Sequence, residues 1–80
     1  MTIDKKRFTE LIELGADIEF LYNGKKYTIL AWIDDGISIG EQNTDNESIY
    51  SNCEDLLQNC IIDGTPLLNA LPKIDITFHT

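Results

Sequence analysis

The chain has 80 residues, 42% of them hydrophobic and 25% charged, so it is long enough for one small folded domain and too apolar for a disordered acidic tail. Fourteen acidic against six basic residues give a formal net charge of −8, which excludes the basic surface needed for direct binding to nucleic acid or an anionic membrane. The same charge favours solubility and rapid encounter with a basic partner. We therefore predict a single domain over residues 1–80.

The N-terminal and cysteine patterns indicate a protein of the cytoplasm. The basic residues 5–7 run directly into the mixed sequence of residues 8–10, without the apolar segment of a secretory signal. No apolar run reaches the roughly 18 residues of a membrane span. Cys53 and Cys60 are too few for a disulfide framework, and on one helix they would lie about 10 Å apart, beyond disulfide reach. We expect both thiols to be reduced and buried.

The first element in chain order is a predicted helix over residues 4–14. Its inner face consists of three apolar residues at helical spacing: Phe8, Leu11 and Ile12. Gly15 follows as a C-cap glycine. Asp4 or Thr2 could cap the start of the helix, and the sequence does not choose between them.

A β-hairpin is predicted next, around Asn23 and Gly24. Both residues tolerate the positive φ that a two-residue type I′ turn requires. The turn sets three pairs opposite each other: Tyr22 with Lys25, Phe20 with Tyr27, and Ile18 with Ile29. Apolar side chains coincide in the last two pairs, which supports this register.

A second turn is predicted at residues 34–36, where two registers compete. A two-residue loop at positions 35 and 36 would set Ile33 opposite a serine. A three-residue loop, with the glycine in a bulge, sets Ile33 opposite Ile37 and Ala31 opposite Ile39. The second register keeps the apolar face continuous, so we favour it.

Residues 41–48 contain no apolar residue and predict a solvated loop. A capping box then predicts a second helix, because Ser51 and Glu54 have the spacing at which each satisfies a backbone donor of the other. Four residues recur on one face of this helix: Cys53, Leu56, Leu57 and Cys60. Both cysteines therefore occupy core positions.

The C-terminal third predicts a short helix and a last strand. Residues 61–64 end the second helix, and Thr65 with Pro66 offers an N-cap and a proline at the first helical position. Pro72 is expected to stop this short helix. Alternation then places three apolar residues on one side of a strand: Ile74, Ile76 and Phe78.

The element order α-β-β-β-α-α-β is typical of an α+β domain. We predict a small antiparallel or mixed sheet of about four strands, with helices packed on it. The position at which the last strand joins the sheet is left open by these patterns.

No group of residues assembles an enzyme or metal site. The only histidine, His79, is the penultimate residue, and Cys53 and Cys60 are directed to the core, so no Cys–His dyad is expected. Two cysteines and one histidine give at most three zinc ligands. Residues 43–47 alternate like calcium ligands but lack the glycine and closing glutamate of that motif. We predict no catalytic residue, no cofactor and no metal.

Apolar residues on both faces of the first hairpin form the candidate functional feature. If Tyr27 and Ile29 face the core, then Leu30 and Trp32 face away from it, with Leu21 beside them across the ladder. Either a helix covers this second face, or the face is an interface for a protein partner or a second copy of the chain. Trp commonly anchors interfaces. The candidate interface residues are Trp32, Leu30 and Leu21.

Residues 18–27, 39–41 and 53–67 carry a hairpin, a strand end and a helix that runs into an Ile-Asp-Gly turn. Together these stretches resemble small uncharacterised proteins of phages and integrated elements in low-GC Gram-positive bacteria. The resemblance lies in features of the fold and implies no catalytic residues.

These observations predict a non-enzymatic interaction or accessory protein of the cytoplasm, encoded by a phage or mobile element as the resemblance implies. Its partner would be a protein or a second copy of the chain, not nucleic acid or a membrane. The alternative function is that of an acidic inhibitor that imitates nucleic acid and occupies the basic channel of a host DNA- or RNA-handling protein. The net charge of −8 motivates this alternative, although the acids are scattered among turns and caps.

Overall fold

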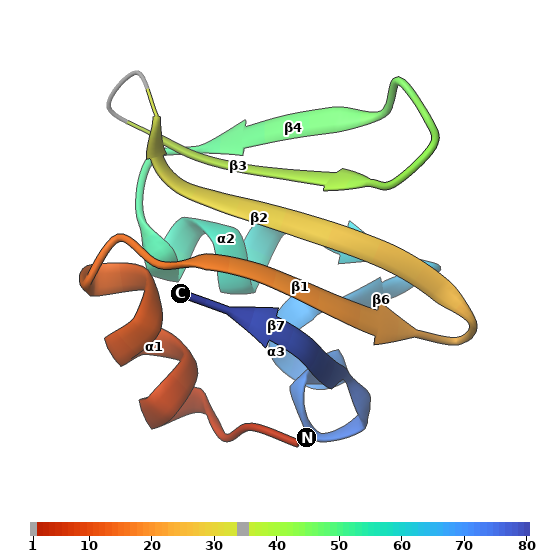
Figure 1. The fold of residues 1–80 in the computed structure, drawn as a ribbon, viewed down its shortest axis with the longest axis horizontal. Coiled ribbons are helices and arrows are strands. Elements are labelled where there is room, and N and C mark those ends of the chain that lie inside the picture. Colours follow the sequence, from red (N-terminus) through yellow and green to blue (C-terminus); the bar gives the residue numbers. More distant parts are fainter. Residues whose placement is uncertain (1, 34–35) are drawn as a thin grey trace.

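The computed structural model describes residues 2–33 and 36–80, which form an α+β fold built on a five-stranded antiparallel sheet (Figure 1). The order of the strands in the sheet is β4-β3-β2-β1-β7. Their bounds are β1 (Asp17–Tyr22), β2 (Lys25–Ile33), β3 (Gly36–Glu41), β4 (Glu47–Tyr50) and β7 (Asp75–His79). The prediction of an α+β domain is confirmed, and the sheet has one strand more than the four expected.

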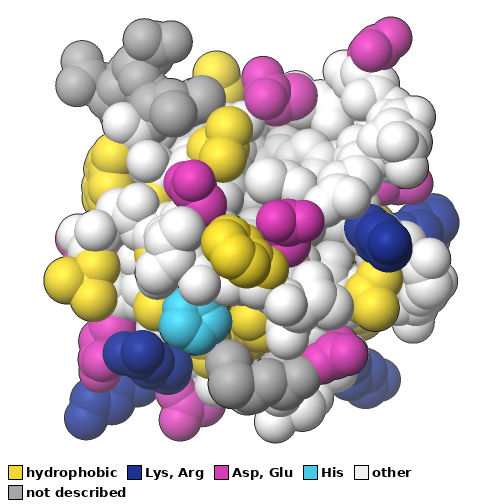
Figure 2. Space-filling model, viewed as in Figure 1, with side chains coloured by type: hydrophobic (Ala, Val, Ile, Leu, Met, Phe, Trp, Pro, Cys, Tyr) yellow, Lys and Arg dark blue, Asp and Glu magenta, His cyan; other side chains and the backbone are white. Residues whose placement is uncertain are grey.

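The helices lie on one face of this sheet. They are α1 (Lys5–Glu13), α2 (Cys53–Asn59) and α3 (Leu67–Ala70), the last continued by a 3-10 turn, η1 (Leu71–Lys73). In Figure 1, α2 and α3 lie behind the strands, and the face toward the viewer is the one whose surface Figure 2 shows. The buried side chains of the helices and of the inner sheet face form one core cluster.

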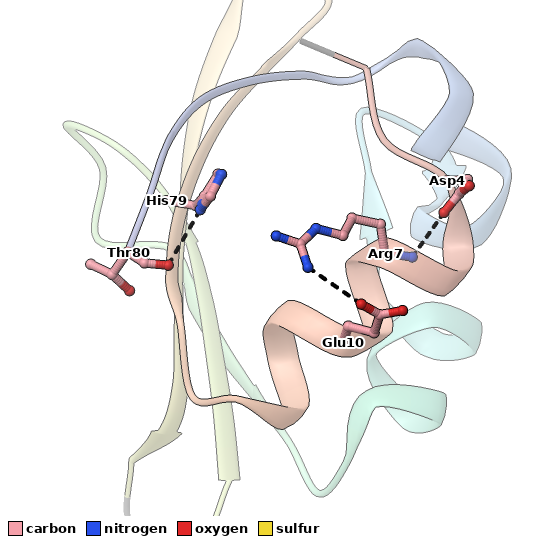
Figure 3. Close-up of polar contacts among 5 residues, drawn as sticks. All are labelled: Asp4, Arg7, Glu10, His79 and Thr80. Atoms are coloured by element: carbon pink, nitrogen blue, oxygen red, sulfur yellow. Dashed lines mark hydrogen bonds and ion pairs between the residues drawn. The ribbon is translucent and has the colours of Figure 1, made fainter.

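Helix α1 is capped at both ends by its own sequence. The Asp4 side chain accepts a hydrogen bond of 2.8 Å from the backbone N–H of Arg7, which identifies Asp4 rather than Thr2 as the N-cap (Figure 3). At the other end Gly15 has a φ of 77°, and the N–H groups of Gly15 and Ala16 donate to carbonyls of the last helical turn. This is a Schellman motif, in which the left-handed residue is a glycine as predicted.

The first hairpin confirms the predicted turn and register. Asn23 and Gly24 have φ angles of 50° and 78°, as a type I′ turn requires. The three predicted pairs are all formed. The rings of Phe20 and Tyr27 stack across the ladder, with centroids 5.2 Å apart.

The register predicted for the second hairpin is wrong. Ile33 pairs with Gly36 rather than Ile37, and Ile39 pairs with Ile29 rather than Ala31. Between these pairs β2 contains one residue more than β3, so β2 is bulged at positions 31 and 32. The physical reason is the backbone of residue 32, which adopts a φ of 62° and breaks the alternation of the strand. Positions 34 and 35 of the predicted turn lie outside the described residues.

Strands β3 and β4 occupy both ends of the segment predicted as a solvated loop, and that prediction is wrong for Glu41, Glu47 and Ser48. Residues 47–50 pair with β3 from Gly40 to Ile37. The turn between the two strands is closed by Thr44, whose hydroxyl donates to the Glu41 carbonyl at 2.8 Å. Because β4 is an edge strand with exposed side chains, the sequence lacks the apolar alternation that would reveal it.

Helix α2 has the predicted buried face, but its cap lies one residue later than predicted. The N-cap is Asn52, whose side chain accepts a hydrogen bond of 2.8 Å from Asp55 N–H. The Asp55 carboxylate in turn accepts one from Ser51 N–H at 3.0 Å, so Asp55 takes the role predicted for Glu54. The four residues of the predicted face, Cys53, Leu56, Leu57 and Cys60, are all buried.

Thr65 does not cap the third helix as predicted. Instead β6 (Thr65–Pro66) pairs with β5 (Ile61–Ile62) around Asp63 and Gly64, whose φ angles of 48° and 80° match those of the first hairpin turn. Helix α3 then begins at Leu67 without a side-chain cap. The α-helix ends at Ala70, before Pro72, and the chain continues as the 3-10 turn η1, which contains Pro72.

The last strand, β7, joins the sheet beside β1, antiparallel to it. Ile74 and Ile76 are buried, but Phe78 is 48% exposed and lies opposite Glu19. A register shift between Glu19 and Phe20 changes the side of β7 on which the later residues fall, so the prediction that Phe78 shares one side of the strand with Ile74 and Ile76 is wrong.

The tips of the two type I′ hairpins are tied to each other. Asp63 accepts hydrogen bonds from the Asn23 side-chain amide at 2.9 Å and from the Lys25 ammonium at 3.0 Å. The hydrogen bonds from Asn23 and Lys25 lower the pKa of the Asp63 carboxyl, and Asp63 raises the pKa of Lys25. These contacts fix the position of the β5–β6 hairpin against the end of the sheet.

Asp63→Asn should therefore lower the free energy of unfolding in a pH-dependent way. Because the pKa of Asp63 is depressed in the folded state, its stabilisation is complete above the unfolded pKa of about 4 and is lost as the pH falls through the folded pKa. The raised pKa of Lys25 removes the contact only at strongly alkaline pH. Urea unfolding should show a constant deficit from about pH 5 to 9 that shrinks below about pH 4. Asp45→Asn, in the β3–β4 turn, is the matched control, and an equal deficit there would contradict the assignment.

Candidate protein interface

The face of the sheet turned away from the helices carries no helix in the part of the chain that the structure describes. Figure 2 shows hydrophobic side chains on it that are separated by acidic and neutral polar ones. We call it the open face, and the strand registers place four large apolar residues on it: Leu21, Leu30, Ile49 and Phe78. Leu21 and Leu30 are half-buried, whereas Ile49 and Phe78 are 58% and 48% exposed.

Cross-strand rows organise the open face. One row runs from Ile49 through Ser38 and Leu30 to Asp17, so two apolar side chains flank a serine there. A second row runs from Glu47 to Phe78 across the middle of the sheet and separates Leu30 from Leu21. Two of the predicted interface residues therefore share a face without lying in one row.

A polar network spans the middle of this face. The Gln42 side-chain amide donates to the Glu19 carboxylate at 3.0 Å and to the Thr28 hydroxyl at 2.9 Å. The β3–β4 turn thus reaches over the sheet, and a Cβ at Gly40 would lie 2.9 Å from the Asn46 carbonyl oxygen. Under this turn is an open hollow of about 190 Å³ whose lining includes Leu30. The open face is therefore concave rather than flat.

The charge of the open face is mainly negative. The registers place one basic residue on it, Lys26. They place four acidic residues on it: Asp17, Glu19, Glu47 and Asp75. A surface that mixes apolar and acidic side chains in this way is suited to a partner with apolar and basic residues.

The third predicted interface residue, Trp32, lies apart from the other two. Its indole N–H donates to the Ile12 carbonyl at 2.6 Å, which places the ring over the C-terminal end of α1. A Cβ at Gly15 would lie 3.8 Å from the Trp32 ring. The side chain is 40% exposed. The bulge in β2 thus directs Trp32 toward the helix layer instead of the open face.

Sequence reasoning missed Ile49 and Phe78 as residues of the open face. Ile49 stands in the segment after the polar loop, where a single isoleucine gives no periodic signal. Phe78 continues the alternation of Ile74 and Ile76, and only the register shift between β1 and β7 moves it to the open face. The spacing of residues in the sequence therefore predicts neither the position of Ile49 nor that of Phe78 on the open face.

The thiols and the histidine lie in separate places. Burial raises the pKa of both Cys53 and Cys60, and the Cys53 thiol lies 3.8 Å from the Thr9 hydroxyl. His79 is exposed on β7, with its ring nitrogen Nδ1 3.3 Å from the Thr80 carbonyl (Figure 3). Among the described residues no group of three His, Cys, Asp or Glu side chains is arranged to hold a metal ion.

The helices of residues 2–33 and 36–80 include none with the length and apolarity to cross a membrane. Comparison of the chain with protein-family models, with curated proteins and with solved structures finds no match in any of the three.

Proposed function

We propose that this chain is a non-enzymatic interaction protein that binds a protein partner through the open face of its sheet. The observation that carries the proposal is the placement of the helices on one face only, which leaves Leu30, Ile49 and Phe78 without a helix over them in the described chain. An antiparallel sheet with one solvated face normally shows polar residues there. Apolar side chains on such a face are typical of a surface that meets another protein.

The charge of the molecule supports a basic partner over a second copy of the chain. Each copy carries a net charge of −8, and the open face itself has more acidic than basic residues. Like charges brought together across an interface oppose association, whereas a basic surface is attracted and oriented by the same charges. We propose a cytoplasmic accessory role for this interaction, in a phage or mobile element, for which the resemblance of the hairpin and the α2 segment is the support.

The test compares open-face variants with a matched variant elsewhere on the surface. Leu30→Lys and Phe78→Lys, combined, should weaken binding of the partner by about 10³-fold, because buried anchors contribute about 2 kcal/mol each at an interface. Leu68→Lys makes the same chemical change on the exposed side of α3 and should leave the affinity unchanged. The partner is first captured from the host on the wild-type chain and then titrated as a purified protein by calorimetry.

Three results would contradict the proposal. Equal affinity of the wild type and the open-face variant would place the interface elsewhere. If the wild-type chain is a dimer and the Leu30→Lys/Phe78→Lys variant is a monomer, the partner at the open face is a second copy of the chain and not a basic protein. Turnover of a small molecule that Cys53→Ala or His79→Ala abolishes would make the protein an enzyme.

The nucleic-acid mimic is distinguished by its salt dependence. The four acidic residues of the open face are the observation that favours it. A mimic replaces phosphates in a basic channel, so its affinity should fall steeply with salt, by a factor of about 10² between 50 and 200 mM if four carboxylates replace four phosphates. An affinity that hardly changes with salt would remove this second candidate.

A further inference from the structure

A second hollow, of about 210 Å³, lies on the other side of the sheet from the open face. It is bounded by the inner side of β3 and β4 and by the β5–β6 hairpin, and none of its lining residues belongs to a helix of the described chain. Its apolar lining includes five residues: Tyr27, Ile39, Tyr50, Cys60 and Ile62. Pockets for drug-sized ligands have about 300–1,000 Å³, so this hollow is closer to the size of one side chain.

Two strands with a free side border this hollow. Strand β4 pairs with β3 only, and β5 pairs with β6 only, among the described residues. Both strands contribute to the lining, through Ser48 of β4 and Ile61 of β5. A strand with one unpaired side is a template for a further extended chain, and a neighbouring pocket can then take alternate side chains of that chain.

The charges at the rim of the hollow favour a cationic side chain. Lys25 is the basic residue of the lining, and its ammonium is already paired with Asp63 at 3.0 Å. The Glu41 carboxylate, on the same rim, forms no ion pair or hydrogen bond within the described ranges. Burial is the main cause of the raised pKa of Tyr27, and the nearby Glu41 carboxylate adds to it. Asp63 is the main cause of the raised pKa of Lys25, and Glu41 makes a smaller contribution there. An incoming Lys or Arg would find an unpaired carboxylate and aromatic walls for its aliphatic stem.

We propose that this hollow binds an extended, basic segment of a partner protein, which adds a strand along β4 and places one Lys or Arg side chain beside Glu41. The hollow lies on the opposite side of the sheet from Leu30 and Phe78, although Gly40, Glu41 and Asn46 at its rim also border the hollow under the β3–β4 turn. Backbone hydrogen bonds to the strand edge would supply affinity, and the hollow would select the side chain. The net charge of −8 favours the encounter.

The test titrates the full ¹⁵N-labelled chain with the peptide acetyl-Thr-Val-Thr-Arg-Thr-Val-Thr-amide and follows the amide signals by NMR. We expect shifts concentrated at β4 and β5, near Ser48 and Ile61. The peptide with Glu in place of Arg should not bind measurably. A peptide with N-methylated valines, which cannot donate to a strand edge, should lose binding in the same way.

Protein variants separate this site from the open face. Glu41→Gln should weaken peptide binding about fivefold. Glu54→Gln is the same change on the solvent-exposed side of α2 and should leave peptide binding unchanged. The Leu30→Lys/Phe78→Lys variant should bind the peptide like the wild type. Shifts on the open face, equal binding of the Arg and Glu peptides, or no shift at all would overturn the proposal. Melting curves of each variant confirm that a lost signal does not come from unfolding.

Discussion

Ile29→Ala should lower the free energy of unfolding by about 2–5 kcal/mol, whereas Leu30→Ala, at the next position of β2, should lower it by less than about 1 kcal/mol. Ile29 is fully buried between the sheet and the helices, so its truncation leaves a cavity in the core. Leu30 is half-buried on the open face, where water can enter the space that the side chain leaves. A domain of 80 residues has roughly 5 kcal/mol of stability, so the first change alone should nearly unfold it.

Urea unfolding followed by circular dichroism measures both values. Ile39→Ala and Ile49→Ala provide a second pair, since Ile39 is buried on the inner face of β3 and Ile49 is exposed on β4. A loss at Leu30 or Ile49 as large as that at the buried isoleucines would mean that the open face is covered within the free molecule. The proposed interface would then have no surface to bind with.

The parts of the fold that the sequence predicts well are those fixed by local chemistry. Asn23 and Gly24 are both suited to positive φ, and this turn sets the whole β1–β2 register. Gly15 ends α1 for the same reason. The buried face of α2 follows from the helical spacing of its apolar residues, including the two cysteines that burial makes poor nucleophiles.

The parts that the sequence does not predict depend on contacts between distant elements. Strand β4 forms because β3 offers it a pairing edge, not because residues 47–50 have a strand pattern. The shift between β1 and β7 depends on how two strands nearly 60 residues apart meet, and it moves Phe78 to the open face. The sequence thus predicts two of the four apolar residues of the open face, Leu21 and Leu30. The other two, Ile49 and Phe78, reach this face only through the pairing of their strands in the sheet.

The bulge in β2 has the same kind of origin. Trp32 adopts a φ of 62°, a conformation that is strained for a bulky residue by about 1–3 kcal/mol. The strain is offset by the contacts of the indole with the end of α1, where its N–H donates to the Ile12 carbonyl. This hydrogen bond joins β2 to a helix that is distant in the sequence, so no spacing rule within β2 could have indicated the bulge.

Trp32→Ala should lower the free energy of unfolding by about 2–4 kcal/mol, since it removes the packing of a partly buried indole and one hydrogen bond. Trp32→Gly removes the same contacts but relieves the backbone, so it should be less destabilising than alanine by about 1 kcal/mol. Trp32→Phe keeps a ring over α1 and loses only the N–H donor, at a cost of about 1 kcal/mol. Because each variant lacks the single tryptophan, unfolding is followed by circular dichroism. Glycine that destabilises as much as alanine would show that the bulge stores no strain, and that the strand pairing, not the indole, sets the register.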